Sequence, residues 1–129
     1  MSSVIEELKN APDYIGGTGR TEDEIRDSEN LLGVKFAADY RCYLKEIGLA
    51  CFDGHELTGI CKATRLNVVD VTLLQRARIA ETNFLYVIEE TGLDEIVIWQ
   101  NSNGIVYLSS SNKAPQKIYS SLREYIAMR

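Results

Sequence analysis

Residues 25–44, IRDSENLLGVKFAADYRCYL, carry the signals of two consecutive helices joined by a tight turn. The first helix begins just before this stretch, where Thr21 and Glu24 form a capping box of the form T-x-x-E. Its inward stripe recurs at helical spacing and consists of Ile25, Ser28, Leu31 and Leu32. Gly33 follows the stripe, at the position where helices often end in the left-handed conformation. The sequence therefore predicts a helix that ends at Gly33.

A second helix is predicted after this turn, with Asp39 as the residue that caps its N-terminus. Gly48 is its expected end, and its inward residues are Tyr40, Tyr43, Leu44 and Ile47. Upstream, Ser3 and Glu6 form another capping box and predict a short N-terminal helix. The glycine-rich residues 16–19 are expected to be a flexible connector between that helix and the next one.

The second half of the chain changes from helical spacing to short apolar runs separated by turn residues. The expected strands cover residues 51–52, 55–60, 68–69, 84–88, 96–99 and 105–108. A middle helix is expected to begin at Asp70 or Thr72, and a closing helix follows the capping box Ser121-Leu122-Arg123-Glu124. Short turns join most neighbouring strands. We therefore expect an α+β fold, a largely antiparallel central sheet of about five to six strands flanked by N-terminal, middle and C-terminal helices.

Length and composition indicate one ordered domain. The 129 residues fit a single domain, 1–129, that begins with the helix and glycine-rich loop of residues 1–20. A hydrophobic content of 45% and only two prolines argue against a disordered chain. A chain of this length buries enough surface to fold without a metal or disulfide.

Charge and apolar patterning argue against several classes of partner. The formal net charge is −5, so the chain lacks the overall basic field on which nucleic-acid binding relies. No apolar run approaches the roughly 20 residues that span a bilayer, and the acidic N-terminus lacks an apolar signal core. The three cysteines are an odd number at unrelated spacings, which favours a reducing compartment. We therefore expect a cytoplasmic protein that binds neither nucleic acid nor membrane.

Several motifs in order resemble the SUKH superfamily of Smi/Knr-like domains. The helical part contributes Ile25…Glu29, Leu32-Gly33-Val34-Lys35-Phe36 and Ala38-Asp39-Tyr40-Arg41-x-Tyr43-Leu44. The later part contributes Phe52-Asp53-Gly54-His55-Glu56-Leu57-x-Gly59-Ile60, Gly104-Ile105-Val106-Tyr107 and Ser121-Leu122-Arg123-Glu124-Tyr125. Ala37 stands where that family often has proline, and Leu122 where phenylalanine is common. The resemblance covers most of residues 20–127.

This resemblance implies a protein-binding domain without an activity of its own. Bacterial members of the superfamily are mostly immunity proteins, which bind a cognate toxin domain in the cytosol, often a nuclease, and block it. Other members are regulatory or scaffold proteins of cell-wall synthesis and signalling. The resemblance therefore implies an immunity protein, with a regulatory or scaffold module acting on an endogenous protein as the alternative. Fold alone does not decide between them.

Residues for enzymatic or metal chemistry do not form a recognisable set in the sequence. His55 is the one histidine, and we expect it to be an exposed residue beside a turn. A pocket joining it to a cysteine or carboxylate would favour an enzyme, such as a small hydrolase or transferase. Cys42, Cys51 and Cys61 lack the paired spacing of structural zinc sites. Residues 16–20 lack the lysine of a phosphate-binding loop. No catalytic residue, metal or cofactor is therefore predicted.

Charge is unevenly distributed along the chain, and this predicts a partner-binding surface. Residues 89–95 contain the four acids Glu89, Glu90, Asp94 and Glu95 and no base, and they are expected to form a loop between two strands. An acidic loop on a rigid sheet suits a basic protein surface, such as that of a nuclease toxin, because opposite fields accelerate association. A second acidic stretch, residues 22–29, is already explained by its place at the start of a helix, where the helix dipole favours negative charge.

Tyrosines extend this prediction because they combine apolar area with a polar tip. Tyr14 and Tyr119 lie near predicted loops, so we expect them to face the partner. Tyr40, Tyr43, Tyr125 and Trp99 are instead expected in the core.

Overall fold

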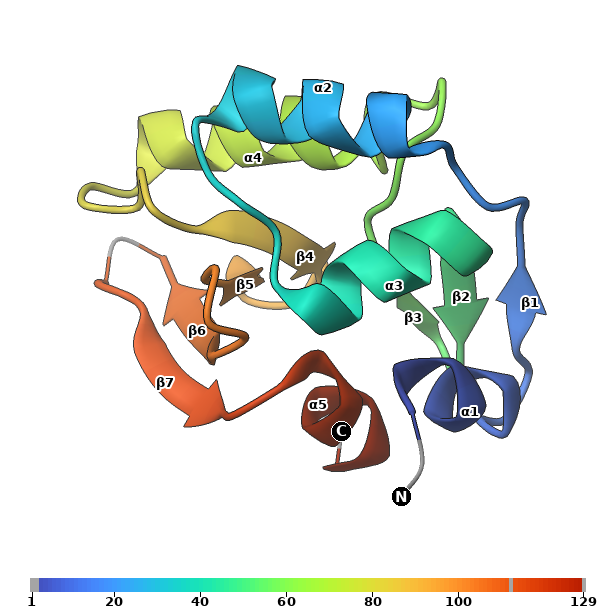
Figure 1. Cartoon of the computed structure of the whole chain (residues 1–129). Coiled ribbons are helices and arrows are strands. Elements are labelled where there is room, and N and C mark those ends of the chain that lie inside the picture. The colour runs from blue at the N-terminus through green and yellow to red at the C-terminus, as the bar shows by residue number, and fades with distance from the viewer. Residues whose placement is uncertain (1–2, 112, 129) are drawn as a thin grey trace.

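The structure, a computed structural model, describes residues 3–111 and 113–128 (Figure 1). Its helices are α1 (Val4–Lys9), α2 (Glu22–Leu32), α3 (Ala38–Glu46), α4 (Val68–Arg78) and α5 (Leu122–Met128). Its strands are β1 (Ile15–Gly16), β2 (Ala50–Phe52), β3 (His55–Glu56), β4 (Tyr86–Glu90), β5 (Ile96–Gln100), β6 (Val106–Ser110) and β7 (Gln116–Tyr119). This mixture confirms the predicted α+β class. Among the described residues, no helix combines the length and apolarity needed to cross a membrane.

The strands form two sheets where the sequence predicted one. Their orders are β1-β2-β3 and β4-β5-β6-β7, and all neighbouring strands are antiparallel. A narrow junction joins them: Leu57 forms a bridge with Glu89, and Thr58 N donates to Ile88 O at 2.9 Å. Because β3 is only two residues long, it cannot continue beside β4, and the sheet divides there.

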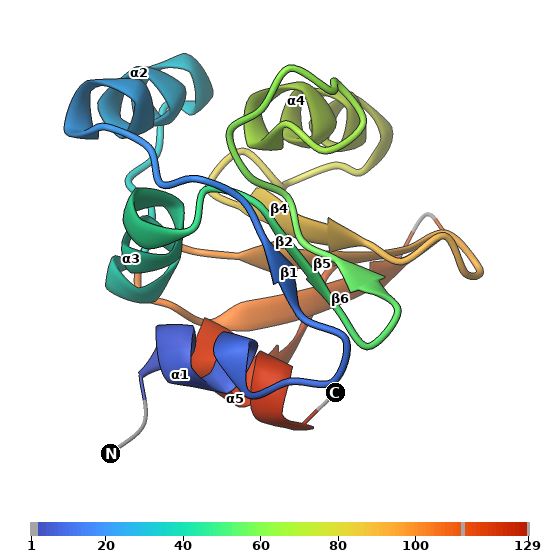
Figure 2. The ribbon, with the colours of Figure 1, turned by 90° about the vertical axis from the view of Figure 1, so that its right-hand side faces the viewer.

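Helices cover both faces of the four-stranded sheet (Figure 2). On one face Val71 of α4 and Ile79, the residue that follows the helix, pack into a small apolar cluster around Trp99. On the other face α1, α3 and α5 contribute to the larger core, to which Leu122 belongs. The two clusters therefore lie on opposite sides of the central strands.

The core aromatics follow the prediction. Tyr40, Tyr43, Tyr125 and Trp99 are all buried. The Tyr43 hydroxyl donates to Thr58 O at 2.8 Å, which satisfies its polar tip inside the core. Burial raises the pKa of both the Tyr40 and the Tyr43 phenol. These side chains therefore act as structural hydrogen-bonding groups.

The helix–turn–helix is formed as predicted, and Glu29 holds its turn. Thr21 and Glu24 make the complete capping box of α2, and Gly33 ends the helix with φ +68°. Glu29 is buried, and its Oε2 accepts a hydrogen bond from Phe36 N at 2.7 Å. This bond ties the last turn of α2 to the chain leading into α3.

Asp39 was predicted to cap α3, and this prediction is wrong. The N-cap of α3 is Ala37, which makes no side-chain bond. The Asp39 carboxylate instead accepts from Leu122 N at 2.7 Å and from Gln100 Nε2 at 3.0 Å. It therefore satisfies the first N–H of α5 and joins three elements that are distant in sequence.

Several strand boundaries differ from the prediction. The predicted strand 68–69 is the start of α4, because the Asn67 side chain accepts from Val69 N and Asp70 N and caps a helix there. The predicted strand 55–60 is reduced to β3, and the predicted strand 84–88 is displaced to β4. β1 and β7 were not predicted at all.

Three glycines allow backbone segments to cross at van der Waals distance. A Cβ at Gly19 would overlap the Lys45 carbonyl, and one at Gly48 would overlap the Thr18 carbonyl. A Cβ at Gly59 would overlap the carbonyl of Gly48 itself. We call Gly19, Gly48 and Gly59 the glycine crossing. It brings together the chain before α2, the end of α3 and the chain after β3.

The glycine-rich residues 16–19, expected to be a flexible connector, make backbone hydrogen bonds and close backbone approaches to neighbouring segments. Gly17 N donates to Leu49 O at 2.8 Å, next to the pairing of β1 with β2. Arg20 N donates to Leu44 O at 2.9 Å, which holds the following residue against α3. The glycines permit close approach in this segment.

The terminal helices α1 and α5 pack side by side (Figure 2). Arg123 Nη1 lies 3.4 Å from Glu7 Oε1, so a salt bridge links the two helices across the sequence. The first and last described helices therefore complete the same layer.

Candidate functional site

The acidic residues Glu90, Asp94 and Glu95 gather at the tip of the β4–β5 hairpin. We call residues 90–95 the acidic hairpin. All three of these acids are exposed, and Glu90 and Glu95 line a hollow of about 240 Å³ between the hairpin and the C-terminal end of α4. Gln75 donates from its amide to Glu90 Oε2, and this neutral partner does not offset the carboxylate charge. The structure thus brings together three of the four acids predicted at the partner surface.

The turn of the acidic hairpin has an unusual backbone. Ile96 N donates to Leu93 O at 2.8 Å, and the two residues between them, Asp94 and Glu95, have φ values of 49° and 56°. Positive φ at both central residues is the signature of a type I′ turn, which favours Asp-Gly or Asn-Gly. Glutamate at the second position is therefore strained, because its Cβ opposes the left-handed conformation.

Glu95→Gly is therefore expected to raise the free energy of unfolding by roughly 0.5–1 kcal/mol. Removing the Cβ relieves a strain of about 1–2 kcal/mol, and the greater freedom of glycine in the unfolded chain offsets part of it. Urea denaturation monitored by circular dichroism measures the change. Gly92→Ala, with φ +73° and open space around its Cα, is the control and should lose about 1 kcal/mol. An unchanged or lower stability for Glu95→Gly would contradict the strained turn.

Glu89 does not belong to this exposed surface, and its predicted place in a loop is wrong. It lies in β4, and the residue is only 3% exposed. His55 Nδ1 lies 2.9 Å from its Oε2, and the Tyr125 hydroxyl donates to its Oε1. The alternation of β4 explains the difference, because Glu89 faces α5 while Glu90 faces α4. Glu89 is therefore a buried structural carboxylate.

His55 was expected to be exposed beside a turn, and it is instead half-buried in β3. Its ring stacks on Phe52, with ring centroids 5.3 Å apart, and its Nδ1 is directed at Glu89. From the sequence, a pocket that joins His55 to a cysteine or carboxylate was expected to favour an enzyme. The carboxylate is present, but it is buried and shared with Tyr125. His55, Glu89 and Tyr125 thus form one hydrogen-bonded cluster between β3, β4 and α5.

The two predicted tyrosines are half-buried and pack against the larger core. Burial raises the pKa of the Tyr14 phenol. The Tyr119 ring lies 6.0 Å from the Tyr125 ring, at the end of β7. The role of Tyr14 and Tyr119 as partner contacts stays a prediction. Glu90, Asp94 and Glu95 are more exposed than these tyrosines and so are more accessible to a partner.

The acids of α2 are mostly used inside the molecule. Glu22 pairs with Arg41 at 3.0 Å and with Lys45 at 3.3 Å. Asp23 pairs with Arg26 at 3.2 Å on the same helix. These ion pairs agree with a structural role for the acids of α2 within the molecule.

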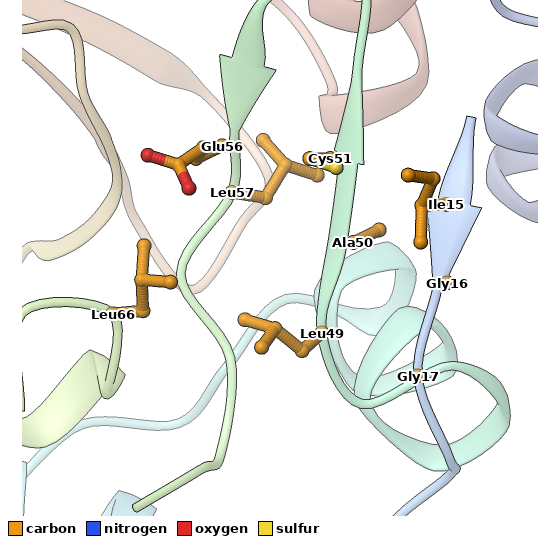
Figure 3. A pocket seen from close by; sticks show the side chains of 9 residues that line it. All are labelled: Ile15, Gly16, Gly17, Leu49, Ala50, Cys51, Glu56, Leu57 and Leu66. Carbon is orange, nitrogen blue, oxygen red and sulfur yellow. The ribbon is translucent and has the colours of Figure 1, made fainter. Parts of the chain in front are cut away.

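A pocket of about 210 Å³ lies over the three-stranded sheet, and the sequence gave no clear signal for it (Figure 3). Its apolar lining includes Ile15 from β1, Cys51 from β2, Leu57 next to β3 and Leu66 from the loop before α4. Ile15 is 68% exposed. A single isoleucine before a glycine run does not indicate a strand, so sequence reasoning missed this site.

The cysteines are free and half-buried. Burial, followed by the nearby Glu46 and Asp39 carboxylates, raises the pKa of the Cys42 thiol. Within residues 3–111 and 113–128, no group of at least three His, Cys, Asp or Glu side chains could hold a metal ion.

The chain is similar to a known protein family and to a solved structure. A family model, SUKH_5, described as SMI1-KNR4 cell-wall, matches residues 1–128. No curated protein matches the chain. A crystal structure of a protein from Pseudomonas syringae pv. tomato is similar, with 16% identity and a TM-score of 0.79. The match covers 97% of this chain and 94% of that chain. At this identity the likeness shows a shared fold.

Proposed function

Because the chain belongs to the SUKH family of SMI1-KNR4 domains, we propose that it is an immunity protein that binds a cognate toxin and occludes it. The motif resemblance to this superfamily is confirmed by the family match. In the proposal the chain performs no chemistry, resides in the cytoplasm and acts by steric and electrostatic blocking.

The exposed acidic hairpin is the observation that carries this proposal. Glu90 and Glu95 flank one hollow, and Asp94 lies beside them in the turn. A nuclease toxin has a basic surface because it must bind phosphate backbones. Opposite charges would accelerate the encounter, and an inhibitor that must act before the toxin reaches its target gains from speed.

The double variant Glu90→Lys/Glu95→Lys should bind its partner more slowly, with an association rate lowered roughly tenfold at low salt. The matched control is Asp23→Lys/Asp27→Lys, which changes the net charge equally on exposed positions of α2. The partner is first isolated by co-purification from the native organism and identified by mass spectrometry. Surface plasmon resonance at several salt concentrations then measures association and dissociation.

A toxin partner with hairpin-specific slowing, strongest at low salt, supports the proposal. Equal rates for the two double variants would place the contact elsewhere on the molecule. The alternative is a regulatory or scaffold module, and the words "cell-wall" in the family description favour it. An endogenous cell-wall protein as the co-purified partner would support that alternative.

A further inference from the structure

The apolar pocket lies on a sheet face that the helices leave open. In Figure 2, β1 and β2 face the viewer with no helix in front of them, whereas α4 covers the neighbouring four-stranded sheet. Ile15 and Cys51 contribute side chains to this open face, and Leu66 closes one side of it (Figure 3). A volume of about 210 Å³ accommodates one leucine-, methionine- or phenylalanine-sized side chain.

The strand register relates this pocket to the acidic hairpin across the single bridge that joins the two sheets. Ile15 pairs with Cys51, and Cys51 pairs with Glu56. The antiparallel bridge between Leu57 and Glu89 places Glu56 next to Glu90. Because residues opposite one another across strands share a face, one row runs from the apolar pocket to the acidic hairpin.

The row begins at the apolar pocket and ends at the Glu90 carboxylate, with the ion pair of Glu56 and Arg65 between them. Arg65 makes two hydrogen bonds to the Glu56 carboxylate, at 3.0 and 3.2 Å, and lowers its pKa. Glu90 accepts a hydrogen bond from the neutral Gln75 amide, and Arg78 lines the same hollow without forming an ion pair with it in the described part of the chain, so the Glu90 carboxylate can still receive a cation. From Cys51 to Glu90 the row crosses two strand spacings, which is about 10 Å.

We propose that the pocket and the acidic hairpin form one groove, and that it binds a segment of the partner protein with a defined pattern. The segment presents one large apolar side chain to the pocket and a lysine or arginine to Glu90, about 10 Å away. In an extended chain side chains on one face recur every second residue, at about 7 Å, so a lysine two residues from the apolar residue covers the distance together with the length of its own side chain. This inference rests on the proposed function and specifies which part of a basic partner is recognised.

Charge distinguishes this occupant from a second copy of the chain. Each copy carries a formal net charge of −5, and the acidic hairpin would face the same acidic surface. A segment with one apolar and one basic side chain can fill the apolar pocket and pair with the Glu90 carboxylate.

The test is an NMR titration of the ¹⁵N-labelled full chain with the capped peptide Gly-Ser-Leu-Gly-Lys-Gly-Ser-Gly at millimolar concentration. Shifts should be confined to the amides of Ile15, Gly16, Cys51 and Glu90 and to their neighbours. Replacing the peptide leucine by alanine, or its lysine by glutamate, should each weaken binding roughly tenfold. Lack of shifts, shifts elsewhere, or equal binding of all three peptides would overturn the groove. Concentration-dependent broadening at these amides without peptide would indicate self-association and also overturn it.

A surface substitution provides the matched control. Ile15→Ser should weaken peptide binding roughly tenfold, whereas Leu31→Ser on α2, which is equally exposed (69% against 68%), should leave it unchanged. Equal effects of the two variants would overturn the role of Ile15.

The same two variants separate this inference from the proposed function once a partner is isolated. Ile15→Ser is expected to raise the dissociation rate, whereas Glu90→Lys/Glu95→Lys lowers the association rate. If the charge variant slows association and Ile15→Ser changes nothing, the groove fails and the proposed function stands. If neither variant has an effect, both fail.

Discussion

Gly48→Ala is expected to lower the free energy of unfolding by roughly 2–5 kcal/mol. The residue has φ +78°, and a Cβ in the left-handed region costs about 1–2 kcal/mol. The new Cβ would also overlap the carbonyl of Thr18, and relieving such overpacking costs a further 1–3 kcal/mol or so. Because domains are stable by only about 5–15 kcal/mol, the variant should lose a large part of its stability.

The control for this prediction is Gly33→Ala. Gly33 has a similar φ of +68°, and nothing lies within 4 Å of the position that its Cβ would take. It should therefore lose only the conformational cost, about 1–2 kcal/mol. Urea denaturation curves of both variants, followed by circular dichroism, give the difference. Equal losses would mean that the backbone crossing relaxes at no cost.

Glu89→Ala is expected to destabilise the fold by roughly 3 kcal/mol. The change removes the shared acceptor of His55 and Tyr125. Each polar group left without its partner costs about 1–3 kcal/mol, and removal of the carboxylate side chain from the buried site adds the cost of lost packing. The cost is large because the carboxylate is 3% exposed, so water cannot replace it.

Glu89→Gln keeps the volume and one acceptor oxygen, so it should lose clearly less than Glu89→Ala. Tryptophan fluorescence is a suitable probe, since Trp99 is fully buried next to the strand that carries Glu89. A loss below about 1 kcal/mol for Glu89→Ala is the range of an ordinary exposed site and would contradict the buried network.

Local signals predicted the helical half of the fold well. The capping box of Thr21 and Glu24 and the left-handed Gly33 depend only on residues within one or two turns, so the sequence contains all the information they need. Tyr40 and Tyr43 were placed in the core by helical spacing alone. Asp39 shows where this reasoning ends, because its partner Leu122 is far away in sequence.

The sheet and the candidate site depended on pairing that local patterns do not contain. β1 is two residues long and exists only because β2 lies beside it. The run of acids placed four carboxylates together in one loop, and the structure leaves Glu90, Asp94 and Glu95 exposed, but the run did not reveal that Glu89 faces the core. That distinction depends on where β4 ends, and strand ends are set by neighbouring strands. The apolar pocket is likewise formed by segments that meet only in the fold.

The pairing of α1 with α5 bears on how the chain folds during synthesis. Glu7 and Arg123 are separated by 116 positions, so α1 leaves the ribosome long before its partner is made. Until α5 emerges, Leu8 on α1 lacks part of its cover, and the Asp39 carboxylate lacks the N–H of Leu122. Contacts of such separation form late because a long loop must close first. A product that stops before α5 would expose apolar surface and be a target for cellular proteases, so the folded protein should be confined to chains that have been translated through Met128.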